Sequence, residues 1–432
     1  MGKWYSLYDK IYRMENLEGA FRQVKRNHGA PGIDGVTIET FEAKLSENLE
    51  LIHKELKTKT YEPNPVRRVE IDKPDGGKRL LGVPTVKDRV VQQAVATILE
   101  PIYDEGFHPS SYGYRKGKSQ AQAIEKATLL MRKYELIHVV DMDLSKCFDR
   151  LDHEFILNEM AKQVSDGSVL KLIRKFLESG VMKDGQFEAT EVGSPQGGVI
   201  SPLLSNVYLN VFDQEMMRRG IRIVRYADDI LIFAKTRAKA DSYLKLATAI
   251  LENDMKLTVN KEKTHLTELT KGVEFLGVRI SSKWISIQPK RLKKFRDKVR
   301  RITRRNSGRP LEVVVEELTP VLRGWINYYR VADIKSLVPD LMGWIRRRLR
   351  MIRMKQWKTY KAMHKELRRK KMKHTGEKMD VRRWKNSKVH IIHMLMPNSY
   401  LDELLFAKLF DGSFFNLIDA EYLNLQGCRQ IS

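Results

Sequence analysis

The feature that most restricts the fold is segment 221–234, in which two strongly apolar runs flank a pair of acidic residues. Apolar residues at 223–224 and 230–233 predict a strand, a tight turn and a second strand, with Asp228 and Asp229 at the turn. Successive side chains of a strand face opposite ways, so both carboxylates reach one site only from a turn. An Asp-Asp pair is also ordinary turn chemistry, which by itself accounts for the pattern.

A third acid also stands beside an apolar run. Asp143 ends the apolar run 137–144, which predicts a buried strand. Carboxylates beside buried β-structure repel one another and need a compensating charge. Mg²⁺ supplies it and prefers a few carboxylates together with water and phosphate. Two such ions about 3.5–4 Å apart activate an attacking hydroxyl and stabilise a leaving oxygen. Asp143, Asp228 and Asp229 are therefore candidate ligands of a catalytic metal site, while turn chemistry stays open for the Asp-Asp pair.

Helices and strands alternate irregularly along the chain. Helical periodicity predicts helices at 86–101, 119–134, 153–164, 168–179, 201–217 and 238–253. Residues 66–71 and 78–83 predict a β-hairpin rich in Lys and Arg. This hairpin could cover phosphates, or it could be an edge of a sheet that its charges keep soluble. Because the strands that carry carboxylates are not successive, the fold class is α+β rather than a doubly wound sheet.

The charge is strongly basic, with 79 Lys and Arg against 54 Asp and Glu and a formal net charge of +25. Residues 290–310 contain eleven basic residues and one acid, and residues 341–385 contain eighteen and three. These two windows account for the whole excess, so the rest of the chain is formally neutral. Positive charge concentrated in this way indicates a polyanionic partner, and we favour nucleic acid over an anionic membrane surface.

In the second window, apolar residues between Trp344 and Trp357 recur at spacings that suit one helix face. The alternative for such a charge run is a solvated helix face. We expect the helix to pack on its apolar side and to offer its arginines to phosphates. The predicted nucleic-acid-binding residues are Arg346, Arg347, Arg348, Arg350 and Arg353.

The two cysteines, Cys147 and Cys428, are far apart and match no zinc-binding spacing. A disulfide scaffold is therefore not expected, and a reducing cytoplasm fits this cysteine usage. No run approaches eighteen apolar residues and the N-terminus lacks the apolar core of a signal peptide, so we expect no membrane association.

Several motifs together resemble those of the reverse transcriptases. Tyr226–Asp229 is similar to their catalytic turn, and Val140–Asp149 to the strand that carries their third catalytic aspartate. In that motif the ligand stands five residues before an aromatic residue, which selects Asp143 with Phe148. The resemblance implies that Phe148 packs against the sugar 2′ position of an incoming deoxynucleotide.

Three further motifs resemble the same family. Ser194–Gly197 is similar to the loop whose glutamine, here Gln196, contacts the incoming nucleotide and the template. Lys73 and Arg79 on the basic hairpin match the family's triphosphate-binding pair. Phe275–Gly277 resembles the primer-grip hairpin. All five motifs occur in the order that the family has.

The remaining resemblance is to bacterial group II intron reverse transcriptases, through Asn16–Gly35, Ser111–Arg115, Gly193–Asn206, Leu322–Tyr329 and Trp344–Trp357. It implies a right-hand polymerase with an antiparallel palm sheet, followed by helical domains. The implied domains are fingers and palm at 1–285 with an N-terminal extension over about 1–40, a thumb or maturase domain at 286–365, and a DNA-binding domain at 366–432.

The resemblance implies an RNA-directed DNA polymerase that copies group II intron RNA into DNA and assists splicing. Its partners would be an RNA template, a DNA target or primer and dNTPs, and its cofactors two Mg²⁺ ions, with Mn²⁺ as an alternative. It would act in the bacterial cytoplasm, associated with the nucleoid. The zinc endonuclease of some relatives is not expected, since its cysteines are missing. Two alternatives stay open: a domesticated relative in phage defence or DNA repair, and a polymerase-dead RNA-binding maturase.

Overall fold

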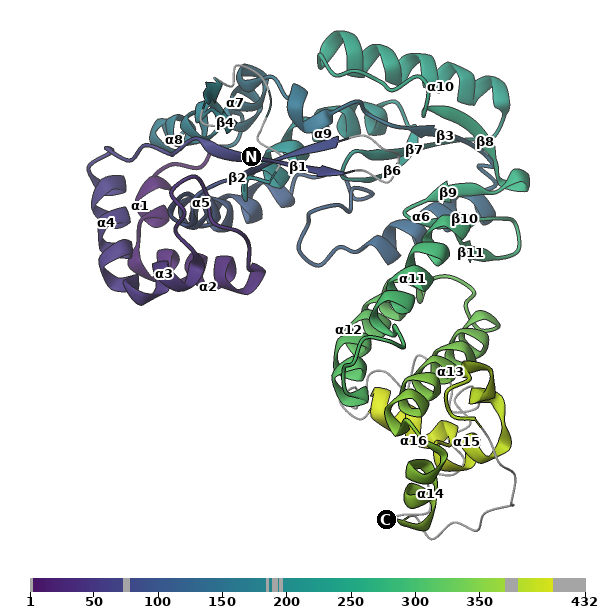
Figure 1. Cartoon of the computed structure of the whole chain (residues 1–432). Helices are drawn as coiled ribbons and strands as arrows, with labels where there is room; N and C mark the ends of the chain where they lie inside the picture. Colours follow the sequence, from purple (N-terminus) through teal and green to yellow (C-terminus); the bar gives the residue numbers. More distant parts are fainter. Residues whose placement is uncertain are drawn as a thin grey trace, which may run out of the picture. The chain divides into compact units, whose positions relative to one another are not determined.

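The computed structural model describes residues 3–72, 78–183, 186–188, 193, 197–369 and 380–406 (Figure 1). The chain divides into two units, Met1–Leu269 and Thr270–Ser432. The boundary between the units precedes residue 285, and Ile285 exchanges backbone and side-chain hydrogen bonds with Asp333 of the second unit. None of the helices in the described ranges is long and apolar enough to cross a membrane.

The first unit is built from helices around two sheets. Thr85 starts α5 and Ser119 starts α6, each with a side-chain oxygen that accepts a hydrogen bond from a backbone N–H three residues later. The helices are, in chain order, α1 (Tyr8–Ile11), α2 (Met14–Asn27), α3 (Ile38–Ala43), α4 (Leu45–Lys57), α5 (Val86–Asp104), α6 (Gln120–Arg132), α7 (His153–Ala161), α8 (Gly167–Glu178), α9 (Ser201–Arg218) and α10 (Arg237–Ala249).

The central sheet of this unit is antiparallel, with the strand order β6-β7-β3-β8. Its strands are β3 (His138–Met142), β6 (Arg222–Tyr226), β7 (Asp229–Ala234) and β8 (His265–Glu268). Helix α10 packs against β3 and β7, while α6 and α9 pack against β6. Helical cover explains why Val139, Val140 and Met142 of β3 are fully buried. The predicted α+β architecture is confirmed.

A second sheet has the order β2-β1-β4-β5, in which β1 (Val66–Asp72) and β2 (Lys78–Val83) form the predicted basic hairpin. The short strands β4 (Val181–Lys183) and β5 (Gln186–Glu188) complete it. The N-terminal segment is tied to this region, since the Arg67 guanidinium donates to the Pro31 carbonyl and that of Arg89 to the Ala30 carbonyl. The N-terminal extension is therefore an integral part of the first unit.

The second unit begins with a three-stranded antiparallel sheet, β9 (Val273–Phe275), β10 (Val278–Ile280) and β11 (Ile285–Ile287). Tyr328 donates to the Leu276 carbonyl and thereby ties the β9–β10 turn to a helix of the same unit. One hydrophobic core joins the helices of this unit. They are α11 (Pro289–Ile302), α12 (Leu311–Tyr329), α13 (Leu337–Trp357), α14 (Tyr360–Arg369), α15 (His390–Leu395) and α16 (Asn398–Phe406), with a 3₁₀ turn η4 (Trp384–Lys388).

Candidate active site and nucleic-acid interface

The acidic turn joins β6 to β7 as predicted. Tyr226 pairs with Asp229 across the hairpin, which leaves Ala227 and Asp228 as a two-residue loop. Ala227 has φ 59°, the left-handed conformation that a type II′ turn requires at its first loop position. In this turn Asp228 is half-buried and Asp229 is exposed.

Strand register brings Asp143 to the same place. Met142 of β3 pairs with Ile230 of β7 as the last pair of the two strands, and Asp143 and Asp229 are the residues directly beyond that pair. Burial raises the pKa of the nearby Cys147 thiol to about 12, and the charge of Asp228 adds to that rise. All three predicted acids therefore lie at one end of the central sheet.

The three carboxylates are neighbours without forming a closed set of ligands. Within the described ranges, no three His, Cys, Asp or Glu side chains come close enough together to hold one metal ion. An ammonium group partly balances the charge, since Lys263 Nζ lies 3.4 Å from Asp143 Oδ2. Carboxylate donors are the type that Mg²⁺ prefers, so the residues fit the ion by chemistry. Their convergence on metal stays a prediction.

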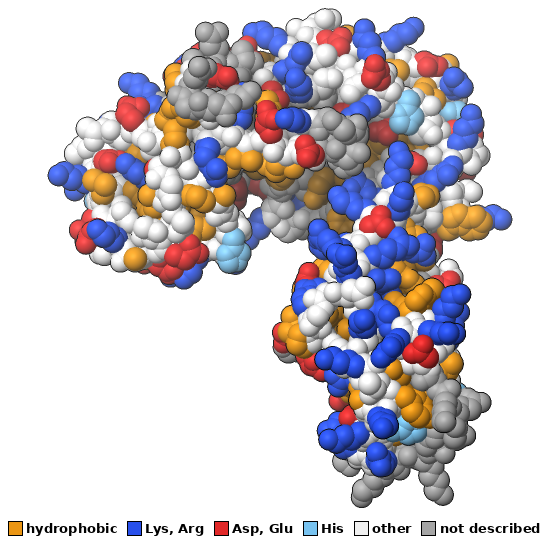
Figure 2. Space-filling view, in the orientation of Figure 1, with side chains coloured by type: hydrophobic (Ala, Val, Ile, Leu, Met, Phe, Trp, Pro, Cys, Tyr) orange, Lys and Arg blue, Asp and Glu red, His pale blue; other side chains and the backbone are white. Residues whose placement is uncertain are grey.

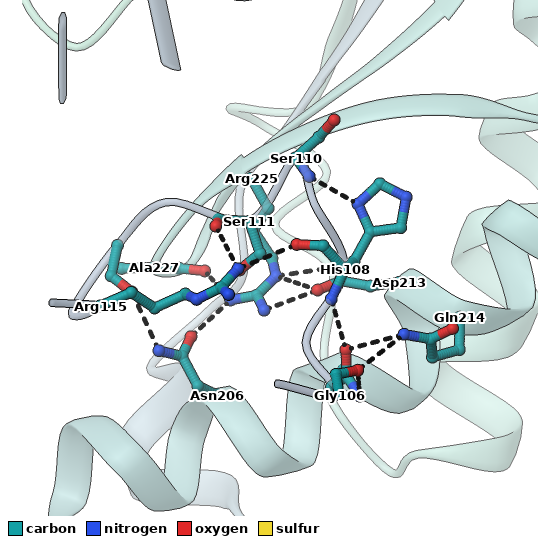
Figure 3. A network of polar contacts seen from close by, with 12 residues as sticks. Gly106, His108, Ser110, Ser111, Arg115, Asn206, Asp213, Gln214, Arg225 and Ala227 are labelled. Carbon is teal, nitrogen blue, oxygen red and sulfur yellow. Dashed lines mark hydrogen bonds and ion pairs between the residues drawn. The ribbon is translucent and has the colours of Figure 1, made fainter. Parts of the chain in front are cut away.

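A buried arginine holds the acidic turn in place (Figure 3). Arg225, directly before the turn, has no exposed surface, and neither does its ion-pair partner Asp213 on α9, at 2.6 Å. Its remaining donors reach Asn206 Oδ1 at 3.0 Å and the carbonyl of Ala227, inside the turn, at 2.9 Å. The turn backbone is thus fixed by a charged group that is itself fully paired.

The segment Ser111–Arg115 supports the turn from another side. Tyr112 N–H donates to the Arg225 carbonyl, and Asn206 Nδ2 donates to the Gly113 carbonyl at 2.9 Å. A Cβ atom at Gly113 would lie 2.2 Å from the Ala227 nitrogen, so only glycine allows this approach. Arg115 fixes the segment by bonding Asp104 and the carbonyls of residues 108 and 111.

Sequence reasoning missed Arg225, Asp213 and Asn206 as site residues. A usable signal was present, because Arg225 interrupts an otherwise apolar strand and Asp213 an apolar helix. A charge at such a position must be paired with an opposite charge or avoid burial.

The residues expected to bind the nucleotide are only partly within the described structure. Lys73 and Gln196 lie outside the described residues, and of Arg79 only the backbone is described, in β2 opposite Ile71. Phe148 lies in the 3₁₀ turn η1 (Cys147–Arg150) and is 6% exposed. Its ring meets that of the exposed Tyr114 edge to face, with centroids 6.3 Å apart.

Two glycines flank the predicted nucleotide loop and link it to these elements. Gly193 N–H donates to the Leu151 carbonyl at 2.9 Å, and the Gly193 carbonyl lies 2.6 Å from His153 Nε2. Gly197 has φ 118° and lies so close to β2 that a Cβ atom would be 2.4 Å from the Gly82 oxygen. The loop thus starts beside the turn that carries Phe148 and ends against the basic hairpin.

The five arginines of α13 that the sequence predicts to bind nucleic acid also make contacts within the second unit. Arg350 is buried, and the other four are half-buried. Arg350 is 2% exposed and donates to the Met396 carbonyl and Asn398 Oδ1. Arg346 forms an ion pair with the buried Asp402 at 2.7 Å. Helix α13 is thus packed on more sides than its apolar pattern indicates, and the nucleic-acid-binding role of its arginines stays a prediction.

The other three arginines of α13 are also engaged within the unit. Arg348 donates to Thr303 Oγ1 at 2.5 Å, and Arg353 donates to Gln356 Oε1 at 3.2 Å. The Arg347 guanidinium lies over the Trp384 ring, 5.0 Å from its centroid. All five arginines of α13 therefore have partners within the second unit.

Helix α11 carries the exposed basic surface instead. Its buried side is apolar, formed by Phe295, Val299 and Ile302. Figure 2 shows Lys and Arg side chains crowded on the visible face of the second unit. The exposed basic residues of α11 are Lys290, Arg291, Lys293, Lys294, Lys298, Arg300 and Arg301.

An antiparallel sheet that presents an Asp-Asp turn beside a third aspartate, with helices behind it, is the palm of a template-directed polymerase. Comparisons with known proteins agree. Residues 71–280 match the family described as reverse transcriptase (RNA-dependent DNA polymerase), and residues 292–372 match the group II intron maturase-specific domain.

Two curated proteins are similar in sequence to this chain. Protein YkfC of Escherichia coli is 33% identical over 312 residues, covering 63% of this chain and 82% of that protein. The group II intron-encoded protein LtrA of Lactococcus lactis is 28% identical over 339 residues, covering 63% of this chain but 56% of LtrA. Among solved structures, apo telomerase from Candida tropicalis has a TM-score of 0.42 at 16% identity, covering 54% of this chain and 58% of that one. The chain belongs to the group II intron reverse transcriptase/maturase family and carries an RNA-directed DNA polymerase domain.

Proposed function

We propose that this protein is the reverse transcriptase of a group II intron, which copies the intron RNA into DNA and assists its splicing. The observation that supports the proposal is the register of β3 and β7, whose last pair, Met142 with Ile230, is next in sequence to Asp143 and Asp229. Reverse transcriptases as a family use divalent metal ions, and the proposed cofactors are two Mg²⁺ ions, with Mn²⁺ as a substitute.

Each proposed role follows from the position of a side chain. Asp143, Asp228 and Asp229 would hold the ions, which when bound activate the primer 3′-hydroxyl and stabilise the leaving pyrophosphate. The ammonium group of Lys263 partly offsets the negative charge of Asp143. Phe148, fixed by its burial, would exclude a ribose 2′-hydroxyl. Lys73, Arg79 and Gln196 are proposed to contact the dNTP.

The proposed partners are the intron RNA as template, a DNA target or primer, and dNTPs, at the nucleoid in the bacterial cytoplasm. The exposed basic side of α11 is the proposed surface for the template and primer backbones, because phosphates bind clustered Lys and Arg. A polymerase-dead maturase is disfavoured, since nucleic-acid binding alone gives no use to three neighbouring carboxylates. A domesticated relative would share the chemistry and differ only in its RNA partner.

The test is primer extension on an RNA template with Mg²⁺, comparing wild type with Asp228→Ala and Asp229→Ala. Both substitutions should reduce DNA synthesis to background while RNA binding stays within twofold. The matched control is Asp241→Ala, which removes an exposed acid of α10 and should leave synthesis unchanged. Extension by the Asp228→Ala/Asp229→Ala double variant would show that the site is wrongly assigned.

A further inference from the structure

One exposed tryptophan of the second unit lies among basic residues. Trp384 is 47% exposed, and its neighbours Arg382, Arg383 and Lys385 are exposed as well. A single exposed apolar side chain is common on protein surfaces and needs no explanation. Trp384 differs because of what covers it and how its backbone is held.

One side of the indole is covered by an arginine. The Arg347 guanidinium lies over the ring, 5.0 Å from its centroid, at a distance that suits a cation–π contact. Arg347 Nε is buried and has no hydrogen-bond partner in the described part of the chain. Nearly half of the Trp384 surface is exposed, so the part of the indole that Arg347 does not cover is open to solvent.

The backbone that carries Trp384 is anchored. Val381 is 2% exposed and belongs to the core of the unit. Arg305 donates to the carbonyls of Val381 and Arg382, the latter at 2.7 Å. Asp380 Oδ1 accepts from the Arg382 N–H at 2.8 Å, so the chain before the tryptophan has a defined turn. The aromatic surface is therefore held in position before any ligand arrives.

A second tryptophan of the unit, Trp344, also contacts arginines but is packed against the core. Two arginines lie over the Trp344 ring of α13, Arg300 at 5.8 Å and Arg348 at 5.5 Å from its centroid. Trp384 has the same kind of arginine contact but remains open to solvent.

We propose that Trp384 is a stacking platform for an unpaired base of a single-stranded nucleic acid. Arg347 stacks behind the indole, and the exposed Arg382 and Lys385 attract the phosphates on either side of that base. In a duplex each base is already stacked within the helix, so only an unpaired base can offer its face to the indole. The surrounding positive charge disfavours a cationic ligand. This inference rests on the proposed function only for the class of partner, nucleic acid.

The test measures binding of the full chain to three probes of equal length: oligo(dT), the same oligomer with abasic sites throughout, and a blunt duplex. Stacking on an aromatic residue changes affinity by roughly 5- to 150-fold per base, so Trp384→Ala should weaken oligo(dT) binding about tenfold. Binding of the abasic oligomer and of the duplex should stay within twofold, because their phosphates are unchanged. Trp384→Phe should recover most of the affinity.

Trp284 supplies the matched control, since it is 58% exposed in the same unit and no arginine lies over its ring in the described structure. Trp284→Ala should change no probe by more than twofold. Oligo(dT) should quench part of the tryptophan fluorescence of wild type and of Trp284→Phe, and less of that of Trp384→Phe. This second readout applies even where Trp384→Ala does not fold.

Two outcomes overturn the inference: unchanged oligo(dT) affinity in Trp384→Ala, or an equal loss on all three probes. An equal loss would mean that the residue supports the fold or the surface charge. None of these measurements requires DNA synthesis. A wild type that binds oligo(dT) through Trp384 but extends no primer would refute the proposed function and leave the stacking platform intact.

Discussion

The buried Arg225–Asp213 pair makes a quantitative prediction about the acidic turn. Asp213→Asn keeps the shape of the side chain and removes its charge, which leaves a fully buried guanidinium without a counter-charge. Removing one partner of a buried ion pair destabilises proteins by about 3–5 kcal/mol. Whole proteins are stable by only about 5–15 kcal/mol, so we expect a large loss.

The double variant Arg225→Met/Asp213→Leu separates charge from packing. It removes both charges together and replaces them with apolar side chains, an exchange that is often close to neutral. Asn206 Oδ1 and the Ala227 carbonyl each lose a donor, at about 1–3 kcal/mol apiece. The double variant should therefore be more stable than Arg225→Met alone, and its DNA synthesis should still fall because the turn has lost its anchor.

Urea unfolding followed by circular dichroism gives the free energies, and hydrogen exchange of peptides from 222–234 reports the turn directly. The control is Glu215→Gln on the same helix. Glu215 also pairs with arginines, Arg218 and Arg219, but at the surface, so its loss should have no measurable effect. If Asp213→Asn unfolds within about 1 kcal/mol of wild type, the argument from burial fails.

Three other predictions concern separate parts of the chain. Replacing Lys290, Lys294 and Lys298 of α11 by Gln should lower the slope of log affinity against log salt by about 2–3, since each phosphate contact contributes about 0.7–0.9. Phe148→Ala should increase incorporation of ribonucleotides, measured by primer extension with each nucleotide type. Cys147 should not react with a thiol reagent at pH 8 in the folded protein, because burial raises its pKa from 9.0 to about 12 and the thiolate is the reactive form. The unfolded thiol ionises first as the pH rises, so the contribution of this residue to stability should fall between these two values.

Each of these predictions has its own control. Changing the exposed lysines Lys235, Lys239 and Lys245 to Gln, in and just before α10, should leave the salt slope unchanged. Unaltered ribonucleotide use by Phe148→Ala would refute its proposed role. The cysteine measurement uses a Cys428→Ser background, in which one thiol should appear only after unfolding.

Hydrophobic patterning predicted three of the four strands of the central sheet. The apolar runs around 137–144 and 221–234 became β3, β6 and β7, because their short length and the turn residues beside them favour strands over helices, whereas β8 was not predicted. Helix ends were less accurate, and the predicted helix 238–253 ends as the π-helical turn Ile250–Asp254. The alignment of β3 with β7, in which Met142 pairs with Ile230, was not predictable from patterning, because it depends on register between strands far apart in the sequence.

The partners of the α13 arginines could not be predicted for a related reason. Periodicity locates an apolar face, but it carries no information about polar partners that arrive from later in the chain. Asp402 and Asn398 lie about fifty residues beyond Arg346 and Arg350, and their contacts turn two expected phosphate ligands into internal ones. A count of charges therefore identifies the class of partner and not the surface that binds it.

The acidic turn shows how one strained residue and one buried charge depend on each other. Ala227 adopts a left-handed conformation that costs a non-glycine residue about 1–2 kcal/mol. Its carbonyl accepts from Arg225, and its nitrogen lies against Gly113, where a side chain would not fit. Arg225 in turn can be buried only because Asp213 neutralises it. Since the strain is offset by contacts from Ser111–Arg115 and from α9, the orientation of Asp228 is determined by residues distant from it in sequence, and a substitution at any of them should affect synthesis.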